Sequence, residues 1–353
     1  MAGTTEAAPP AESKQPQVNR IGLSKKDYGG LKSTLCIGCG HDLITARIID
    51  ACYNLGVRPE SVAKLSGIGC SSKTPAYFLN RSHGFNSVHG RMPAIATGVQ
   101  MANKNLKMIA VSGDGDSANI GMGHFVHVMR RNLNLLYIVE NNGVYGLTKG
   151  QFSATADKGS KQKSGNVNPN DPIDLCEMAY MLGCGFIARL FAGNMKQMTS
   201  VIEAAIAYQG LAFLDIISPC VTFNNHDGST KSFAYSKANE EPLHDIGFVP
   251  AYDPTYMEMD HGEEREITLS DGSHITLKAL AKDFNPSDRV AAGNQIMEAK
   301  HTKKILTGLI YVNPKSELLM DQMQVVDTPL ALLTEKETRP SESVLKQIMD
   351  DLA

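Results

Sequence analysis

The chain has 353 residues, a length that suits one large α/β domain with an additional segment. The formal net charge is −3 and 42% of the residues are hydrophobic, so the composition supplies a core and lacks the basic character of a nucleic-acid-binding protein. The sequence has no apolar run of membrane-helix length and no signal-peptide centre near its start, so we expect a cytoplasmic protein with no nucleic-acid or membrane partner.

Taken in chain order, residues 1–19 are rich in Ala, Pro, Glu and Gln and are expected to form a disordered tail. Residues 20–225 then alternate between helix-like periods and apolar strand-like runs. Predicted strands cover residues 61–67, 107–113, 133–140, 185–190 and 212–218, and predicted helices cover 42–56, 93–105, 119–132, 173–183 and 196–210. This alternation predicts an α/β domain with a doubly wound, mainly parallel sheet.

After residue 225 the alternation fades. Residues 226–353 contain a hairpin pattern, EREITLSDGSHITLKAL, in which Asp-Gly separates two alternating segments, and an apolar run, TGLIYVN. We expect a C-terminal arm or small subdomain that packs on the core or on a partner chain.

Four motifs follow predicted strands directly: GIGCS, GDGD, NNGVYG and SPC. In open α/β sheets, ligands bind outside the carboxyl ends of the strands. The four motifs are therefore expected to meet at one edge of one sheet.

The GDGD motif lets the backbone approach a diphosphate closely, and it places Asp114 where a metal would lie. By itself it also fits a plain tight turn. The next strand ends in Asn141 and Asn142, which add oxygen ligands of the kind that Mg²⁺ prefers. Together these motifs resemble the GDG…NN signature of thiamine-diphosphate enzymes, which gives the metal to Asp114, Asn142 and the backbone of Val144, and the diphosphate to the backbone of Gly115 and Asp116.

The seven cysteines are an odd number, which in a reducing compartment favours metal or redox chemistry over disulfides. We expect three of them, Cys52, Cys176 and Cys184, to pack in the core. The C-x-x-C pair Cys36 and Cys39 alone fits zinc, disulfide redox chemistry or an iron–sulfur cluster. Beside a thiamine cofactor, zinc would serve only folding, whereas a cluster would accept electrons.

The motifs CIGCGH, GIGCSS, HGR, GDGD, NNGVYGLTKGQ and SPC, in this order, resemble the β subunit of the 2-oxoacid:ferredoxin oxidoreductases over residues 31–225. The resemblance implies a [4Fe–4S] cluster held by Cys36, Cys39, Cys70 and Cys220. It also implies a thiamine-diphosphate pocket lined by Ile68, Gly69, Cys70, Ser71, His89, Gly146 and Leu147. His89 and Arg91 also fit a role as hydrogen-bonding groups that stabilise a turn.

The same resemblance implies coenzyme A as co-substrate, ferredoxin as electron carrier, and an obligate α subunit in an αβ or (αβ)₂ assembly. The α subunit is expected because this chain has no second domain for the pyrimidine half of the cofactor and its activating glutamate. Leu147 stands where pyruvate-specific members carry asparagine, which favours 2-oxoglutarate over pyruvate. Two other readings remain: a non-redox thiamine carboligase with a structural zinc, and an iron–sulfur electron-transfer subunit with a vestigial GDGD turn.

Overall fold

The computed structural model describes residues 17–243, 260, 264–268, 274–278, 284–302 and 304–353. Most of the predicted tail, residues 1–19, lies outside this part of the chain. Its end is held in the fold, because Val18 forms an isolated bridge with Ser24 and the Asn19 amide donates a 2.8 Å hydrogen bond to the Tyr28 hydroxyl. The contacts of the folded domain therefore begin slightly before residue 20.

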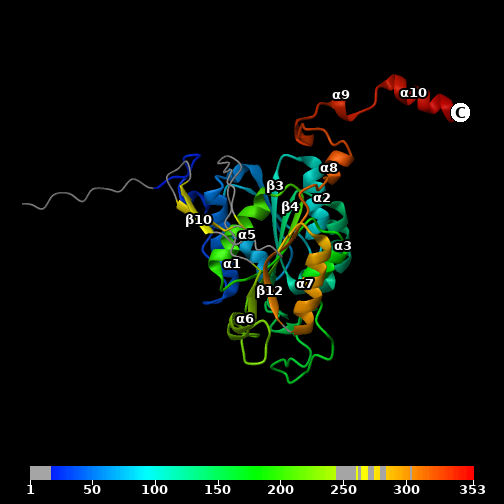
Figure 1. Ribbon diagram of the computed structural model, residues 1–353. Coiled ribbons are helices and arrows are strands. Elements are labelled where there is room, and N and C mark those ends of the chain that lie inside the picture. Colours follow the sequence, from blue (N-terminus) through cyan, green and yellow to red (C-terminus); the bar gives the residue numbers. More distant parts are fainter. Residues whose placement is uncertain (1–16, 244–259, 261–263, 269–273, 279–283, 303) are drawn as a thin grey trace, which may run out of the picture.

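A sheet of eight strands forms the centre of the described chain (Figure 1). Its strands are, in spatial order, β2 (His83–Asn86), β1 (Val62–Ser66), β3 (Lys107–Gly113), β4 (Leu135–Asn141), β8 (Leu211–Ile217), β7 (Phe186–Phe191), β12 (Ile305–Val312) and β9 (Glu240–Pro242). Neighbouring strands run parallel except at the β7–β12 pair, which is antiparallel. The predicted mainly parallel α/β fold is confirmed.

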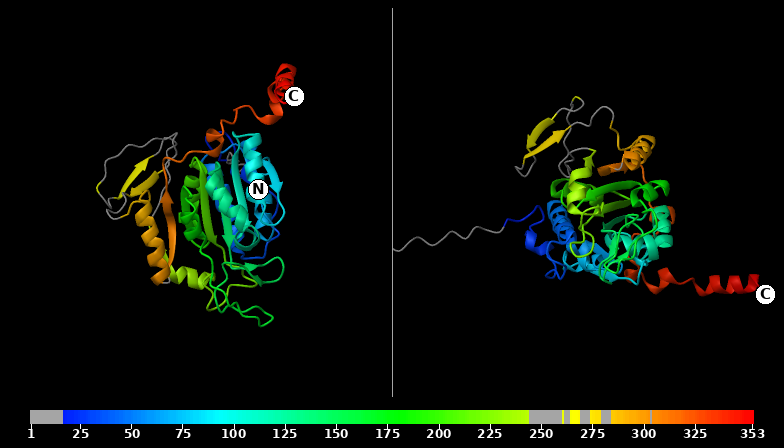
Figure 2. Two further views of the ribbon diagram at one scale, coloured as in Figure 1. Left: turned by 90° about the vertical axis from the view of Figure 1, so that its right-hand side faces the viewer. Right: turned by 90° about the horizontal axis from the view of Figure 1, so that it is seen from below.

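Helices cover both faces of this sheet (Figures 1 and 2). The helices of the described chain are α1 (Gly40–Asn54), α2 (Met92–Ala102), α3 (Met122–Arg131), α4 (Leu175–Met181), α5 (Met195–Ala207), α6 (Phe233–Asn239), α7 (Arg289–Thr302), α8 (Leu319–Gln322), α9 (Glu335–Thr338) and α10 (Glu342–Asp351), of which α9 and α10 lie away from the sheet. One apolar layer joins α1 and α5 to one face, and a second joins α2, α3, α4 and α7 to the other.

The central strand β4 shows how the sequence builds two layers. Because successive side chains of a strand point to opposite faces, Leu135, Tyr137 and Val139 enter one apolar layer while Leu136 and Ile138 enter the other. All five are buried. A strand buried on both faces reads as a continuous apolar run, which is the pattern seen in the sequence.

Polar side chains fix where several helices begin. The Asp174 side chain accepts hydrogen bonds from the backbone amides of Cys176 and Glu177 at the start of α4, and the Asn194 side chain caps α5 through the amide of Gln197. Such caps satisfy amides that have no partner inside the helix.

Short elements complete the described chain. They are the 3₁₀ turns η1 (Lys25–Tyr28), η2 (Pro59–Ser61), η3 (Ser71–Ala76) and η5 (Leu330–Leu332), the π-turn η4 (Asp116–Ile120), and the strand pairs β5–β6 (Val144–Tyr145, Gln151–Phe152) and β10–β11 (Glu264–Thr268, His274–Lys278). The antiparallel β10–β11 pair confirms the predicted hairpin, whose Asp-Gly turn lies outside the described residues.

The C-terminal extension, residues 226–353, contributes to the core itself. Strand β12 lies next to β7 in the main sheet, with Ile310 buried in the same apolar layer as α7. The α/β layer therefore does not stop at residue 225, because the apolar TGLIYVN run is a strand of the main sheet. Beyond α8 the chain leaves the body, and α10 projects away from it (Figures 1 and 2).

The three cysteines predicted to pack in the core, Cys52, Cys176 and Cys184, are buried in the two apolar layers. Within the described residues, no helix has the length and apolar character needed to cross a membrane.

Candidate functional site

The four strands that precede the predicted motifs, β1, β3, β4 and β8, are consecutive in the sheet. They run parallel, so their carboxyl ends share one edge. The predicted convergence of the motifs is confirmed, and it follows from topology, since the motifs are far apart in sequence.

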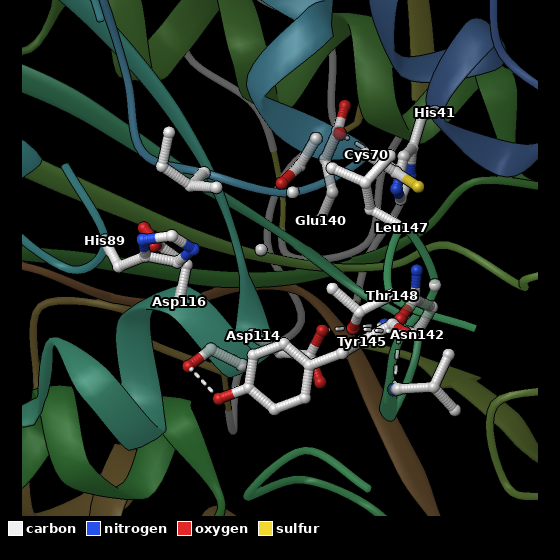
Figure 3. Close-up of a pocket in the computed structure, with 17 residues that line it drawn as sticks. His41, Cys70, His89, Asp114, Asp116, Glu140, Asn142, Tyr145, Leu147 and Thr148 are labelled. Carbon is white, nitrogen blue, oxygen red and sulfur yellow. Dashed lines mark hydrogen bonds and ion pairs between the residues drawn. The ribbon is translucent and has the colours of Figure 1, made fainter. Parts of the chain in front are cut away.

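One cavity at this edge collects the residues predicted for the metal and for thiamine diphosphate (Figure 3). It is lined by Ile68, Gly69, Cys70, Ser71, His89, Asp114, Gly115, Asp116, Asn142, Val144, Gly146 and Leu147. Further lining residues, which lie in or next to the motifs but were not predicted as site residues, are His41, Gly113, Glu140, Tyr145 and Thr148.

Asp114 lies fully buried at the end of β3, and its two oxygens have different surroundings. Oδ2 accepts hydrogen bonds from the Gly143 amide at 3.1 Å, from the Thr155 hydroxyl at 2.6 Å and from the Ser153 hydroxyl. Oδ1 accepts only a long 3.4 Å contact from the Asn142 amide. The carboxylate is thus held by one oxygen, and the other is available to a cation in the cavity.

Burial raises the pKa of the Asp114 carboxyl, and the hydrogen bonds from Ser153 and Thr155 oppose that rise. A divalent cation beside Oδ1 would favour the ionised form, since an opposite charge stabilises a buried carboxylate. Ser153 and Thr155 were missed by the sequence reasoning, because a Ser-x-Thr after a loop of this kind has no recognised spacing from the GDGD motif.

The two asparagines that end β4 face different neighbours. Asn142 lines the cavity, and its side-chain oxygen accepts a 3.1 Å hydrogen bond from the Val144 amide. Asn141 instead donates to Asp215 at 2.9 Å and accepts from the Thr155 hydroxyl at 2.8 Å. Asn142 is therefore the asparagine at the cavity, and its assignment to the metal stays a prediction.

The chain at the cavity floor needs glycine for space. A Cβ on Gly115 would lie 2.5 Å from the ring of Tyr145, whose hydroxyl donates a 2.9 Å hydrogen bond to the Gly115 carbonyl. A side chain at this position would displace the tyrosine ring. Glycine at this position therefore lets the Tyr145 ring pack against the turn.

Asp116 positions the loop that carries His89. Its carboxylate accepts hydrogen bonds from the Ser112 hydroxyl at 2.7 Å and from the Gly90 amide at 2.8 Å. His89 lies beside Asp116 in the cavity (Figure 3), while Arg91 donates to the carbonyls of His89 and Ile120. Arg91 therefore has the turn-stabilising role, and His89 faces the cavity.

A buried polar row lies on the opposite side of the cavity. The Thr74 hydroxyl donates to both oxygens of Glu140, at 3.0 and 3.1 Å, and His41 Nδ1 lies 3.5 Å from Glu140 and 2.6 Å from the Ser218 hydroxyl. Burial raises the pKa of Glu140 well above its usual range and lowers the pKa of His41 to about 4. Both shifts favour the uncharged form of the side chain, as full burial does.

The four cysteines predicted as cluster ligands come from three segments, and two of these segments lie beside Gly146. The position of a Cβ on Gly146 is 3.5 Å from Cys70 Sγ and 3.7 Å from Cys220 Sγ, so the turn lies next to both thiols. Cys36 lies beside the Cys220 segment, because its thiol accepts a 3.6 Å hydrogen bond from Thr222. Cys39 is the N-cap of α1, and burial raises the pKa of its thiol to about 12.

All seven cysteines are free thiols. Among the described side chains, no three of His, Cys, Asp or Glu stand close enough together to hold a metal ion in the arrangement shown. Cysteine sulfur is the donor that an iron–sulfur cluster takes, whereas the oxygen donors near Asp114 are of the kind that a hard cation takes. The same turn, Gly146 and Leu147, thus borders both donor sets.

Comparison with known proteins decides the family. Residues 67–216 match the family "Thiamine pyrophosphate enzyme, C-terminal TPP binding domain". The chain is 38% identical, over 73% of its own length and 79% of the relative, to the 2-oxoacid:ferredoxin oxidoreductase subunit beta of Saccharolobus solfataricus. The chain belongs to the β subunits of the 2-oxoacid:ferredoxin oxidoreductases.

Two further similar proteins are named for 2-oxoglutarate. The 2-oxoglutarate oxidoreductase subunit KorB of Mycobacterium tuberculosis is 38% identical over 59% of this chain and 55% of its own length. A solved structure of 2-oxoglutarate:ferredoxin oxidoreductase from Magnetococcus marinus, with 2-oxoglutarate, coenzyme A and succinyl-CoA bound, aligns with a TM-score of 0.72 and 27% identity. That alignment covers 96% of this chain and 99% of the other, and the resemblance stated from the motifs is confirmed.

Proposed function

We propose that this chain is the β subunit of a 2-oxoglutarate:ferredoxin oxidoreductase. The enzyme would oxidatively decarboxylate 2-oxoglutarate to its coenzyme A thioester, or run the reverse carboxylation, and exchange two electrons with ferredoxin one at a time. The observation that carries the proposal is the Gly146–Leu147 turn, which borders the Asp114 cavity and contacts two of the four thiols. A decarboxylation site and an electron exit would thus share one wall.

The donors in the cavity fit Mg²⁺ and thiamine diphosphate. Oδ1 of Asp114, the side-chain oxygen of Asn142 and the carbonyl of Val144 would hold the metal, since all three residues line the cavity and oxygen donors suit Mg²⁺. The backbone at Gly115 and Asp116 would lie against the diphosphate, with His89 beside Asp116. When bound, thiamine diphosphate supplies the electron sink for decarboxylation, and a [4Fe–4S] cluster supplies one-electron transfer.

The four thiols of Cys36, Cys39, Cys70 and Cys220 would hold that cluster, whose soft iron favours thiolate over oxygen. Zinc on the same thiols would give a non-redox carboligase, and iron and sulfide analysis with an absorption spectrum separates the two, because zinc gives no visible chromophore. Bound thiamine diphosphate would eliminate a purely electron-transferring subunit. Seven free cysteines suit a reducing compartment, so we place the protein in the cytoplasm.

The α subunit is part of the proposal, because the described chain has one α/β sheet, which holds the diphosphate side of the site. We propose an αβ or (αβ)₂ complex with the cofactor at the interface. The isolated chain is expected to bind iron without reducing ferredoxin, and adding the α subunit should restore the activity. Turnover by the isolated chain would contradict this arrangement.

In this proposal, Leu147 determines the preference for 2-oxoglutarate over pyruvate. Its side chain is half exposed at the cavity and offers an apolar surface. The test is kcat/KM of the co-purified complex with 2-oxoglutarate and pyruvate in parallel, and 2-oxoglutarate should be preferred. Leu147→Asn should shift the ratio toward pyruvate, because a hydrogen-bonding side chain discriminates more strongly than an apolar one. A native preference for pyruvate would favour the pyruvate:ferredoxin type and leave the fold and both cofactor sites unaffected.

A further inference from the structure

A second hollow, of about 240 Å³, lies next to the segment that follows Cys220. One wall comes from the loops around β5 and β6, and the other from residues 221–226. Lys149, Lys161, Lys163 and His226 line it, and none of its lining residues is Asp or Glu. The hollow is therefore an electropositive feature in a chain whose formal net charge is −3.

Lys161 and Lys163 have no carboxylate partner among the described residues. In the part of the chain that the structure describes, no ion pair involves Lys161 or Lys163, whereas the neighbouring Lys158 pairs with Asp171 at 3.0 Å. The Lys163 ammonium lies 4.8 Å from the centre of the Phe223 ring, and a contact of this kind positions a cation without neutralising it. Both lysines are exposed, on a loop that projects beneath the sheet in Figure 1.

The hollow adjoins the cysteine segments. Val221 and Thr222 line it directly after Cys220, and the Thr222 hydroxyl donates to the Cys36 thiol. Val221 also lies against the C-x-x-C loop, because a Cβ on Gly38 would be 3.8 Å from its side chain. Within that loop Ile37 is fully exposed, and Val221 is 37% exposed. The cysteine segments thus carry a small exposed apolar surface, and the hollow lined by lysines adjoins it.

We propose that this face, defined by Ile37, Val221, Lys161 and Lys163, docks an acidic protein that carries single electrons. The inference rests on the proposed function, which needs an electron exit near the thiols. Protein complexes for electron transfer have small interfaces and short lifetimes. Opposite charges on the two partners raise the rate at which they associate. An apolar centre over the donor with unpaired charges beside it meets both needs: the lysines steer the carrier, and the apolar contact excludes water between the two redox groups.

The alternative occupant is a small anion such as the phosphates of coenzyme A. The observations favour a protein, because the lysines are exposed on a projecting loop and the apolar side chains next to them point to solvent. A phosphate site is built from donors that converge in a closed pocket or at a helix N-terminus.

The test uses the complete αβ complex with the double variant Lys161→Glu/Lys163→Glu. The matched control is Lys196→Glu, which reverses an exposed charge on α5 and lines none of the hollows described. The readouts are the KM for a purified acidic ferredoxin at several salt concentrations, the KM for coenzyme A, and 2-oxoglutarate-dependent reduction of methyl viologen, a small acceptor that needs no docking surface.

The double variant should raise the KM for ferredoxin about tenfold and flatten its salt dependence, because electrostatic steering is screened by salt. Its methyl viologen rate and the kinetics of the control should match the wild type. An unchanged KM for ferredoxin would overturn the proposal, and so would a rise confined to the KM for coenzyme A. If the proposed function itself is wrong, the result is distinguishable, because the wild-type complex would then reduce neither ferredoxin nor methyl viologen with 2-oxoglutarate. If the double variant does not fold, Lys161→Gln/Lys163→Gln gives the same test with a smaller expected effect.

Discussion

At the residue scale, the two carboxylate oxygens of Asp114 have different surroundings. Three donors hold Oδ2, so the side chain is fixed without a cation, whereas Oδ1 accepts only the long contact from the Asn142 amide. The sequence predicted Asp114, Asn142 and Val144 because they lie in a motif of known spacing. It missed Ser153 and Thr155, whose contribution depends on how the loop after β4 folds back.

Removing one of these donors should weaken the metal site. Thr155→Val keeps the volume of the side chain and deletes the hydroxyl that bonds both Asp114 and Asn141. We expect the affinity of the αβ complex for Mg²⁺ and thiamine diphosphate to fall about 10- to 100-fold, the usual cost of losing a group that orients a metal ligand. Calorimetric titration of the αβ complex with Mg²⁺ and thiamine diphosphate measures this affinity. Thr155→Ser should retain most of the affinity, and equal binding by both variants would refute the role.

The thiols allow a second prediction at this scale. In anaerobically purified complex, Cys220→Ser should lose iron, because a hard hydroxyl oxygen replaces a soft thiolate. Cys52→Ala, a change in the apolar layer under α1, should keep the full iron content. Iron and acid-labile sulfide analysis makes the measurement, and full iron in Cys220→Ser would remove this residue from the ligand set.

At the scale of elements, the alternation of apolar runs predicted the strands that precede the motifs. The same pattern could not predict the places of strands β2 and β12 in the sheet. β2 is exposed along its whole length, so it carries no apolar pattern, and its place at the sheet edge depends on backbone pairing with β1. β12 was visible only as an apolar run, because its antiparallel pairing with β7 results from packing between distant segments.

The position of β12 inside the sheet predicts a large effect on stability. Ile310→Ala removes a fully buried side chain between β7 and α7 and should lower the free energy of unfolding by about 2–5 kcal/mol. Val290→Ala on α7, where the side chain is 70% exposed, should change it by no more than about 0.5 kcal/mol. Denaturant titration of the purified complex compares the two. Similar values would mean that β12 is a peripheral arm.

At the scale of the whole molecule, the chain divides into a body and a C-terminal segment with no buried side chain. Residues 329–353 have no buried member, and α10 exposes an apolar stripe that includes Leu345, Ile348 and Met349. The last anchor to the body is Asp327, which pairs with Lys104 at 2.7 Å. The sequence could not locate this boundary, because TPLALL and SVLKQI are as apolar as segments that pack.

Truncation after Thr328 should therefore leave the body intact. We expect the free energy of unfolding of the isolated chain to change by no more than about 0.5 kcal/mol, since no buried surface or ladder hydrogen bond is lost. Thermal and denaturant unfolding of the two chain lengths measures this. A drop of several kcal/mol in the shortened chain would show that the segment folds onto the body in solution.

The glycine turn at residue 146 has a consequence for protein engineering. Gly146 lines the cavity, and the same turn lies next to the thiols of Cys70 and Cys220. In the proposed enzyme, a substitution that widens or narrows this turn to admit a different 2-oxoacid would move backbone that lies next to these sulfur atoms. Altered substrate range and altered electron delivery should then appear together in the same variants, so libraries built at Leu147 need screening for both traits at once.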